Sequence, residues 1–415
     1  MKKTALVLAL GSAFAGAALA QSSVTLYGRI NQSFDIDNYK GARNEQAVHN
    51  NSSRIGFRGV ESIDGSTNTI FGVETALNAD NGASGLGNTL RNAYVGLQGA
   101  GWGGFAVGRL DVSTPVRYGS APLYAQFADV WSDVNQDNGV SNFTDTSGPI
   151  AQGTYAATAA GTASNSSRTF AIATRESNAL AYASPNLGGF NFGLRYAQRG
   201  TEAQNGGNAN SFNNAATGNN LEQDQKRLQL AGTYNKAGLV VGLGYEKANY
   251  RDSNVVGQQV ANGGALTNFN LDNRWQFVAG YDLKVVKVGF IYARNGIVNA
   301  DTNTAITTGR NDTTSIRNNR SKTNEWGVSL KAPFGAHEVL FNYGQADLAD
   351  DSSAKRRQAQ LGYGYNLSAR TRLYAFYQNL TLSTNNNFGF TPTGATSFVG
   401  SPRINTFSVG IRHNF

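Results

Sequence analysis

Cysteine is absent from the 415-residue sequence, so neither a disulfide-bonded scaffold nor a metal site built on thiolates is possible. Beyond residue 20, no apolar run approaches the roughly 18 residues that a membrane-spanning helix requires. Proline occurs only 7 times, whereas glycine, tyrosine and phenylalanine occur 49, 18 and 22 times, which is not the composition of a disordered chain. The mean hydropathy of −0.36 also suits a soluble secreted protein, so the periodicity must decide the class.

Histidine is scarce as well, and its positions argue against hydrolytic chemistry. Of the three histidines, His49 is expected in a loop, His337 beside a tight turn and His413 on the last strand, with no nucleophile elbow near any of them. We therefore expect no catalytic triad and no enzyme activity. The carboxylates at 347–351 indicate a hydrated loop, so we expect no metal and no cofactor. The basic residues form no stripe or helix face, which excludes nucleic acid as a partner.

The amino terminus has the pattern of an export signal. Lys2 and Lys3 precede an apolar run over residues 5–19, and Ala18-Leu19-Ala20 forms an A-x-A-type cleavage site. We expect residues 1–20 to be a signal peptide and the mature chain to begin near Gln21. A membrane anchor is the alternative, but the run is short for a spanning helix, ends in small residues and precedes strand-like sequence.

The rest of the chain alternates with a period of two, as a strand does when its two faces meet different surroundings. In the first segment Val24, Leu26 and Ile30 share one face, and Thr25 and Arg29 lie on the other. The same apolar or aromatic alternation recurs along the chain in Phe190/Phe192/Leu194/Tyr196, Leu239/Val241/Leu243/Tyr245, Trp275/Phe277/Ala279/Tyr281, Val286/Val288/Phe290/Tyr292 and Leu361/Tyr363/Tyr365. One face of each strand is therefore apolar, and the other is polar, charged or glycine.

Connections between these segments alternate in length. The short ones have turn-forming sequences: Asp64-Gly65-Ser66, Ala100-Gly101, Pro185-Asn186-Leu187-Gly188, Lys236-Ala237-Gly238, Ala332-Pro333-Phe334-Gly335 and Asn366-Leu367-Ser368-Ala369. The long ones are polar: 37–51, 79–88, 112–167, 200–225, 251–271, 299–322, 347–355 and 383–403. Tight turns at one rim and long loops at the other are typical of a membrane barrel. We expect an all-β fold, a barrel of about sixteen antiparallel transmembrane strands with short periplasmic turns and long extracellular loops.

The connection over residues 112–167 is far longer than an ordinary loop. Its first half carries five large apolar or aromatic residues: Tyr118, Leu123, Tyr124, Phe127 and Trp131. An exposed loop is one interpretation. The other is a loop that folds inward and narrows the barrel, because a barrel of this size would otherwise leave a wide aqueous hole. We expect the inward-folded arrangement.

Several segments, in order, carry a resemblance to a known family. They are Ser23-Val24-Thr25-Leu26-Tyr27-Gly28, Ser53-Arg54-Ile55-Gly56-Phe57-Arg58-Gly59, Asn92-Ala93-Tyr94-Val95-Gly96-Leu97, Gly108-Arg109, Tyr182-Ala183-Ser184-Pro185-Asn186 with Gly188-Gly189-Phe190, Tyr365-Asn366-Leu367-Ser368-Ala369-Arg370-Thr371 and Val409-Gly410-Ile411-Arg412-His413-Asn414-Phe415. Together they resemble the Gram-negative trimeric porins, most closely the general porins of β-proteobacteria. Ala369 departs from the lysine that is usual in that turn, a change that we interpret as neutral.

The resemblance implies a homotrimer in the outer membrane, with the third extracellular loop folded inward to form a constriction. It also implies a basic wall cluster, which maps onto Arg29, Arg54 and Arg109, with Arg168 a looser match. Alternation independently places Arg29, Arg54 and Arg58 toward the interior. Arg109 shares parity with outward-facing positions, so its inward placement requires a bulge and rests on the resemblance alone.

On the loop side of that constriction, the available carboxylates are Asp111, Asp129 and Asp133. Gln126 occupies the place where the family often has a glutamate, which weakens the acidic half. The net charge of +8 becomes +6 once Lys2 and Lys3 leave with the signal peptide. We therefore expect a weak preference for anions.

The function implied is a water-filled channel for passive diffusion of ions and small hydrophilic solutes. The implied partners are outer-membrane lipid and lipopolysaccharide, and the barrel assembly machinery, for which Phe415 at the end of an amphipathic strand is part of the signal. The alternative is an outer-membrane barrel that acts mainly as an adhesin or structural surface protein. The many small polar residues on the inner face favour an open lumen over a barrel filled with side chains.

Overall fold

The computed structural model describes residues 23–39, 44–51, 53–77, 79–80, 90–110, 176–199, 223–252, 267–300, 320–348, 351–382 and 403–415. Every regular element within these residues is a strand. None of the described residues forms a helix long and apolar enough to cross a membrane. The long segment 112–167 lies outside the described residues.

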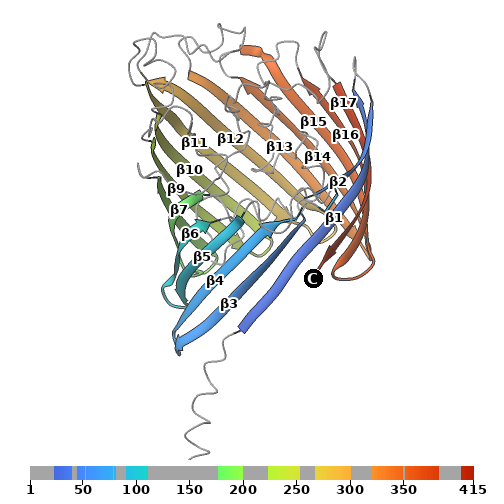
Figure 1. The fold of residues 1–415 in the computed structure, drawn as a ribbon. Coiled ribbons are helices and arrows are strands. Elements are labelled where there is room, and N and C mark those ends of the chain that lie inside the picture. Colours follow the sequence, from blue (N-terminus) through green and yellow to red (C-terminus); the bar gives the residue numbers. More distant parts are fainter. Residues whose placement is uncertain are drawn as a thin grey trace, which may run out of the picture.

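The strands form one antiparallel sheet that closes on itself (Figure 1). Their bounds are β1 Ser23–Tyr39, β2 Glu45–Asn50, β3 Arg54–Asp64, β4 Thr67–Ala76, β5 Leu90–Gly99, β6 Gly103–Leu110, β7 Glu176–Ala183, β8 Phe190–Arg199, β9 Gln223–Lys236, β10 Leu239–Asp252, β11 Thr267–Asp282, β12 Lys287–Ala300, β13 Arg320–Phe334, β14 His337–Leu348, β15 Asp351–Asn366, β16 Thr371–Leu382 and β17 Arg403–Asn414. β2 and β3 pair in succession along the same edge of β1 and so act as one interrupted strand. The seventeen labelled strands therefore make a sixteen-stranded barrel, which confirms the expected fold.

Closure joins the two ends of the chain. β1 pairs with β17 along Arg29–Tyr39, and the last residue continues this ladder. The backbone N–H of Gly28 donates to the carbonyl of Phe415 at 3.0 Å, and the N–H of Phe415 donates to the carbonyl of Gly28 at 3.1 Å. The Phe415 ring covers Gly28, where a Cβ atom would lie only 2.3 Å from Phe415 Cζ. A closed barrel leaves no strand edge with unpaired backbone groups.

A bulge separates β2 from β3. Gln32 of β1 pairs with Asn50, and Arg29 pairs with Arg54, so two residues of β1 face three residues of the partner. The backbone N–H of Asn51 donates to the carbonyl of Asn31 at 2.8 Å, which bridges the interruption. An extra residue on one strand re-aims the side chains that follow it. In this position the bulge aligns Arg54 with Arg29 on the same face of the sheet.

Seven short connections, β3–β4, β5–β6, β7–β8, β9–β10, β11–β12, β13–β14 and β15–β16, lie at one end of the barrel, which we call the turn end. In the β3–β4 turn, Asp64 Oδ1 accepts the backbone N–H groups of Ser66 and Thr67, both at 2.8 Å. In the β9–β10 turn, Ala237 and Gly238 have φ angles of 53° and 85°, which suit the two-residue turns that match strand twist. At the opposite end, β1 reaches Tyr39 and β2 begins at Glu45, so the loop expected over 37–51 is shorter than the sequence indicated. The loop expected over 347–355 at this end is wrong in its bounds, because β14 reaches Leu348 and β15 begins at Asp351.

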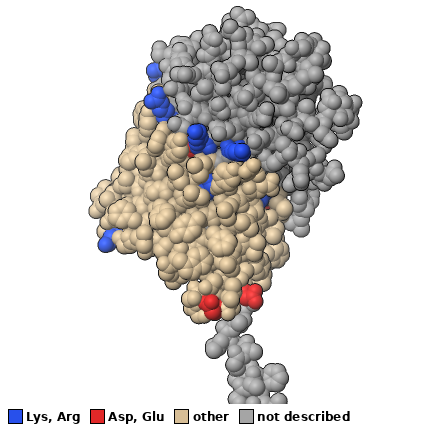
Figure 2. All heavy atoms as spheres, turned by 90° about the vertical axis from the view of Figure 1, so that its left-hand side faces the viewer, with Lys and Arg blue, Asp and Glu red and all other residues tan. Residues whose placement is uncertain are grey.

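The outer face is apolar. Leu243 is 51% exposed, whereas its neighbours Gly242 and Gly244 are buried. The same holds on β15 for Leu361 between Gln360 and Gly362, and Phe57 and Phe192 are likewise exposed on the outer face. In Figure 2, blue side chains gather beside the grey atoms at the top, red ones lie at the lower end, and the wide band between them is almost entirely tan. An exposed apolar band flanked by polar ends is the surface of a barrel in a membrane.

Candidate functional site

The inner face of the barrel is lined by polar side chains. On β1, Asn31, Ser33, Asp35 and Asp37 are all buried, and they alternate with outward positions such as Phe34. Most of the other strands also contribute buried polar residues at their inward-facing positions. They are Glu74, Asn92, Arg195, Gln229, Glu246, Gln276, Ser329, Glu338, Asn342, Gln358, Gln360, Arg372, Gln378, Thr406 and Ser408. This lining is hydrophilic, unlike the core of a soluble protein.

Three inward tyrosines lie over glycines of neighbouring strands. A Cβ atom at Gly56 would lie 2.8 Å from Tyr27 Cζ, and one at Gly410 would lie 2.3 Å from Tyr374 Cζ. Tyr94 is placed over Gly72 in the same way. Because glycine has no side chain, each ring occupies the space above the next strand.

Arginine residues form the centre of the charged wall. Arg29 of β1 and Arg54 of β3 stand directly opposite each other in the ladder. Arg29 Nε donates to Asn414 Oδ1 at 3.1 Å. Like charges in directly opposite positions are unfavourable for the fold. Their presence here therefore points to a role other than stability.

Glu74 connects this pair to β5. Its carboxylate is 2% exposed and lies 3.7 Å from Arg54 Nε and 2.6 Å from Arg91 Nε.

Arg58, nearer the turn end of β3, stacks over the Tyr27 ring with 5.0 Å between Cζ and the ring centroid. Such a contact between a cation and an aromatic ring favours the guanidinium position over open water.

The charged wall continues in the other direction along β17 and β16. Arg412 of β17 pairs with Asn31 of β1, two residues along the ladder from the Arg29–Asn414 pair and on the same face. On its other side, Arg412 stands directly opposite Arg372 of β16. Arg372 forms an ion pair with Glu338, which also binds Lys331 Nζ at 2.9 Å. We call this set the basic band: Lys331, Arg372, Arg412, Arg29, Arg54 and Arg91, with the carboxylates Glu338 and Glu74 between them.

A second charged group lies on β8–β10. Arg195 is 1% exposed, and its Nε donates to Gln229 Oε1 at 2.6 Å. Gln229 in turn donates its amide to Glu246, which is fully buried. This chain links an arginine to a carboxylate through a shared amide, so the pair is close to electrically neutral.

The inner face also has an apolar stretch. Ile70, Ala106, Leu110 and Ala181 are completely buried, and Ala179 and Ala197 are nearly so. We call this cluster on β4, β6, β7 and β8 the apolar patch. Tyr94 and Ala183 pack against these residues, so this part of the inner wall is an apolar cluster within an otherwise polar lining.

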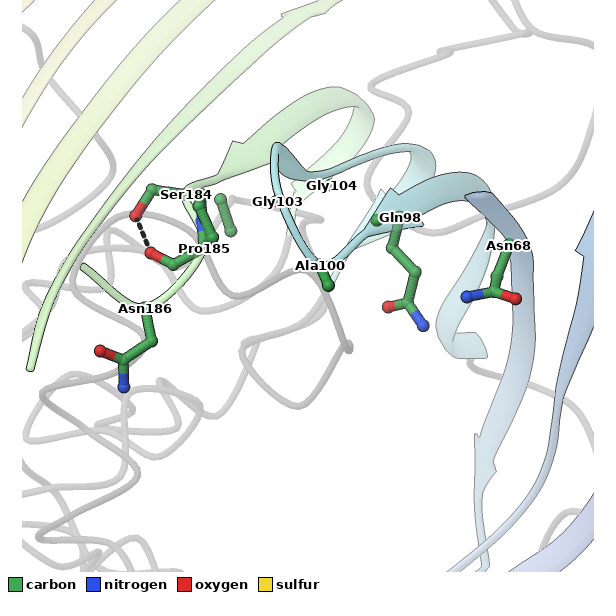
Figure 3. A pocket seen from close by; sticks show the side chains of 10 residues that line it. Asn68, Gln98, Ala100, Gly103, Gly104, Ser184, Pro185 and Asn186 are labelled. Carbon is green, nitrogen blue, oxygen red and sulfur yellow. Dashed lines mark hydrogen bonds between the residues drawn. The ribbon is translucent and has the colours of Figure 1, made fainter. Parts of the chain in front are cut away.

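A pocket of about 440 Å³ opens at the turn end, beside the β5–β6 and β7–β8 connections. Figure 3 shows the amides of Asn68, Gln98 and Asn186 around it, with Ser184 and Pro185 in the β7–β8 connection. Its lining contains no charged residue. Within the described part of the chain, no group of histidines and carboxylates is arranged to hold a metal ion.

Comparison with known proteins decides the family. The model of the Gram-negative porin family matches residues 4–386. The chain belongs to the Gram-negative porin family. An outer membrane porin of Bordetella pertussis and outer membrane porin protein 32 of Delftia acidovorans are each 28% identical to it, over 449 and 429 aligned residues that cover all of both chains.

Solved porins share the fold. The anion-selective porin of Comamonas acidovorans matches with a TM-score of 0.62 and 21% identity, over 95% of this chain and 100% of that one. The trimer form of OmpT from Vibrio cholerae matches with a TM-score of 0.53 and 15% identity, over 95% and 99% of the two chains. This porin is therefore an outer-membrane channel, as the sequence motifs predicted, and its family is one of channels rather than enzymes.

The structure places the predicted wall residues of this porin as follows. Arg29, Arg54 and Arg58 lie on the inner face. Arg109 stands opposite Ala93, and its Nε donates to the carbonyl of Leu90 at 2.5 Å near the rim. The register between β6 and β7 shifts between Gly108 and Leu110. Four predicted residues lie outside the described part of the chain: Arg168, Asp111, Asp129 and Asp133.

Sequence reasoning missed four of the six cations of the basic band. Arg372 and Arg412 share the inward parity of Gln378 and Ser408, but neighbours such as Tyr374 made the face look apolar. Arg91 is displaced by the register shift between β4 and β5, which no sequence pattern marks. Lys331 and Glu338 flank the β13–β14 turn, and no sequence pattern singled them out.

Proposed function

We propose that this porin conducts ions and small hydrophilic solutes passively, with a weak preference for anions. The observation that carries the preference is the basic band, in which six cations share two carboxylates on one stretch of the inner wall. Asp35 and Asp37 lie nearer the loop end of β1, where Ser408 and Thr406 donate to them. With these two aspartates included, the six cations of the basic band face four carboxylates, an excess of two. This small excess favours anions only weakly.

The location of these charges matters more than the net charge of the chain. Exposed charges on the outside are screened within roughly 8–10 Å at physiological ionic strength. Inside a narrow lumen, low-dielectric walls focus the field and change the local concentration of ions. An excess of arginine on the wall therefore raises the concentration of anions in the channel. The anion-selective porin of Comamonas acidovorans supports this proposal as a protein of the same fold.

An inward-folded third loop, residues 112–167, is part of the proposal. The support is the apolar patch, because Ile70, Leu110 and Ala181 are buried on a face that would otherwise meet water. The aromatic residues expected in the first half of that loop, such as Phe127 and Trp131, have the chemistry to cover it. The cover would then lie across the lumen from much of the basic band and narrow the path beside it.

We further propose a homotrimer whose outer band contacts outer-membrane lipid and lipopolysaccharide. The trimer form of OmpT supports the assembly, and the exposed apolar belt supports the lipid contact. Residues 1–20 would be removed as a signal peptide. Phe415, which closes the barrel on β1, would serve as part of the signal for the barrel assembly machinery.

Recording from purified protein in planar lipid bilayers tests this function. We expect stable conductance steps that occur in groups of three, as three channels of one trimer open together. Under a salt gradient, the reversal potential should have the sign of a modest anion preference. Absence of conductance would contradict the channel, and a clear preference for cations would contradict the selectivity.

A further inference from the structure

Glu338 sits at the turn end of the inner wall and binds basic side chains from both directions. It is the second residue of β14, and its carboxylate is about 5% exposed. On one side Oε2 lies 2.9 Å from Lys331 Nζ of β13, and on the other side Oε1 pairs with Arg372 Nη2 of β16. Arg372 is itself 8% exposed, so this contact is held away from bulk water, where an ion pair is weakest.

The pairing with Arg372 has to cross an intervening strand. β15 lies between β14 and β16, and Gly364 of β15 stands opposite Glu338. A Cβ atom at Gly364 would lie 2.6 Å from Arg372 Nε, 2.7 Å from Arg372 Nη2 and 2.8 Å from Glu338 Oε1. The ion pair therefore runs over the bare backbone of Gly364, in space that any other residue would fill.

We propose that Glu338 is a selectivity-determining residue of this channel, which acts at the turn end by neutralising Lys331 and Arg372 and holding both side chains against the wall. Removing its charge would leave two cations beside Arg412, which already stands opposite Arg372. The carboxylate thus limits how strongly this mouth attracts anions. Because Gly364 leaves room under the ion pair, the side chains of Arg372 and Glu338 lie against the wall and do not project into the channel.

This inference deepens the proposed anion preference and rests on the same conducting barrel, but it concerns a difference between variants. The sign of the wild-type reversal potential tests the proposed preference. The shift that a substitution at 338 causes tests the present inference. A wild-type channel that prefers cations would contradict the former and leave the latter to be decided by its own measurement.

The first test changes charge without changing size. Glu338→Gln should shift the ratio of anion to cation permeability toward anions by about two-fold, because one unit charge at about 8 Å in water, screened over about one Debye length, acts on anions and cations in opposite directions. Lys331→Gln should shift it in the opposite direction by a similar factor. Only channels from folded, heat-modifiable protein are compared. If Glu338→Gln does not fold, Lys331→Gln decides alone, and an unchanged reversal potential in the folded variants overturns the proposal.

The second test changes geometry without changing charge. Gly364→Ala puts a methyl group under the ion pair, so Arg372 and Glu338 must move toward the lumen. Gly362→Ala is the matched control, because it lies two residues away on the same face, and its Cβ atom would meet the nearest atoms at 3.5 and 3.6 Å, an ordinary contact. We expect a lower single-channel conductance for Gly364→Ala than for Gly362→Ala. Equal conductances would show that the ion pair does not set the width of this mouth.

Discussion

The basic band and the apolar patch occupy the same inner face but have opposite chemistry. The band uses strands β13–β17, β1 and β3–β5, and its cations are linked through Glu74 and Glu338. The patch uses β4 and β6–β8, and Ile70, Ala106 and Leu110 are fully buried. Alternation decides which residues point inward, but it does not decide what they meet there. One part of the wall is polar and charged, and another is apolar.

Both regions depend on a closed barrel, so the largest effect should come from opening it. Deleting Phe415 removes two backbone hydrogen bonds to Gly28 and the ring that covers it. We expect unassembled, protease-sensitive protein in the periplasm, measured by heat-modifiability on gels and by proteolysis of cell fractions. Phe415→Tyr keeps the ring and the backbone and should assemble. Normal yields of heat-modifiable trimer from the deletion would rule this role out.

The assignment of the inner and outer faces can be tested on a single strand, β10. Leu243 is 51% exposed on the lipid side, and Gly242 is buried on the lumen side. Leu243→Arg should cost about 2–4 kcal/mol of folding free energy, because it places a charge in hydrocarbon. Gly242→Ser should cost far less. Refolding from urea into liposomes measures both, and equal yields would mean that the two faces are assigned the wrong way round.

The alternation and the turn chemistry made the barrel predictable, and their absence explains some of the errors at the loop end. The strands at that end are longer than expected, with β2 at Glu45–Asn50 and β11 beginning at Thr267. In β2 no apolar period marks the strand, whereas at the start of β11 Phe269 and Leu271 continue the alternation of Trp275, a signal that was assigned to the loop. His49 accordingly lies on β2 rather than in a loop. The β11–β12 turn was missed because Lys284, and not glycine, adopts the positive φ of 75°.

The wall was predictable only where the register is regular. Parity along β1 and β3 predicted one face for Arg29 and Arg54, and the two residues stand opposite each other in the ladder. Arg91 follows a register shift, and Glu338 reaches Arg372 across a strand, so neither contact can be derived from spacing along the chain. Contacts of this kind depend on which strands lie beside a given strand in the barrel and in what register. The sequence of that strand alone does not specify either.

The covering of the apolar patch can be tested by making one of its residues polar. Ile70→Asn buries an amide without a partner, which should cost about 1–3 kcal/mol and loosen whatever covers the patch. We expect a lower urea midpoint and faster proteolysis within residues 112–167. Phe71→Leu, on the adjacent outward position, keeps an apolar side chain and serves as the control. An unaffected Ile70→Asn variant would mean that the patch faces water.

The central claim is that charges on the inner wall, and not the net charge of the chain, set the selectivity. Its most direct test is the reversal potential under a salt gradient for Arg54→Glu and Lys236→Glu, which change the net charge equally. Arg54 belongs to the basic band, whereas Lys236 is exposed beside the β9–β10 turn on the parity of outward Leu230. We predict a shift toward cations of about four-fold in permeability ratio for Arg54→Glu, from two unit charges at about 8 Å in water screened over about one Debye length, and no shift for Lys236→Glu. Equal shifts in both variants, or none in Arg54→Glu, would contradict the account.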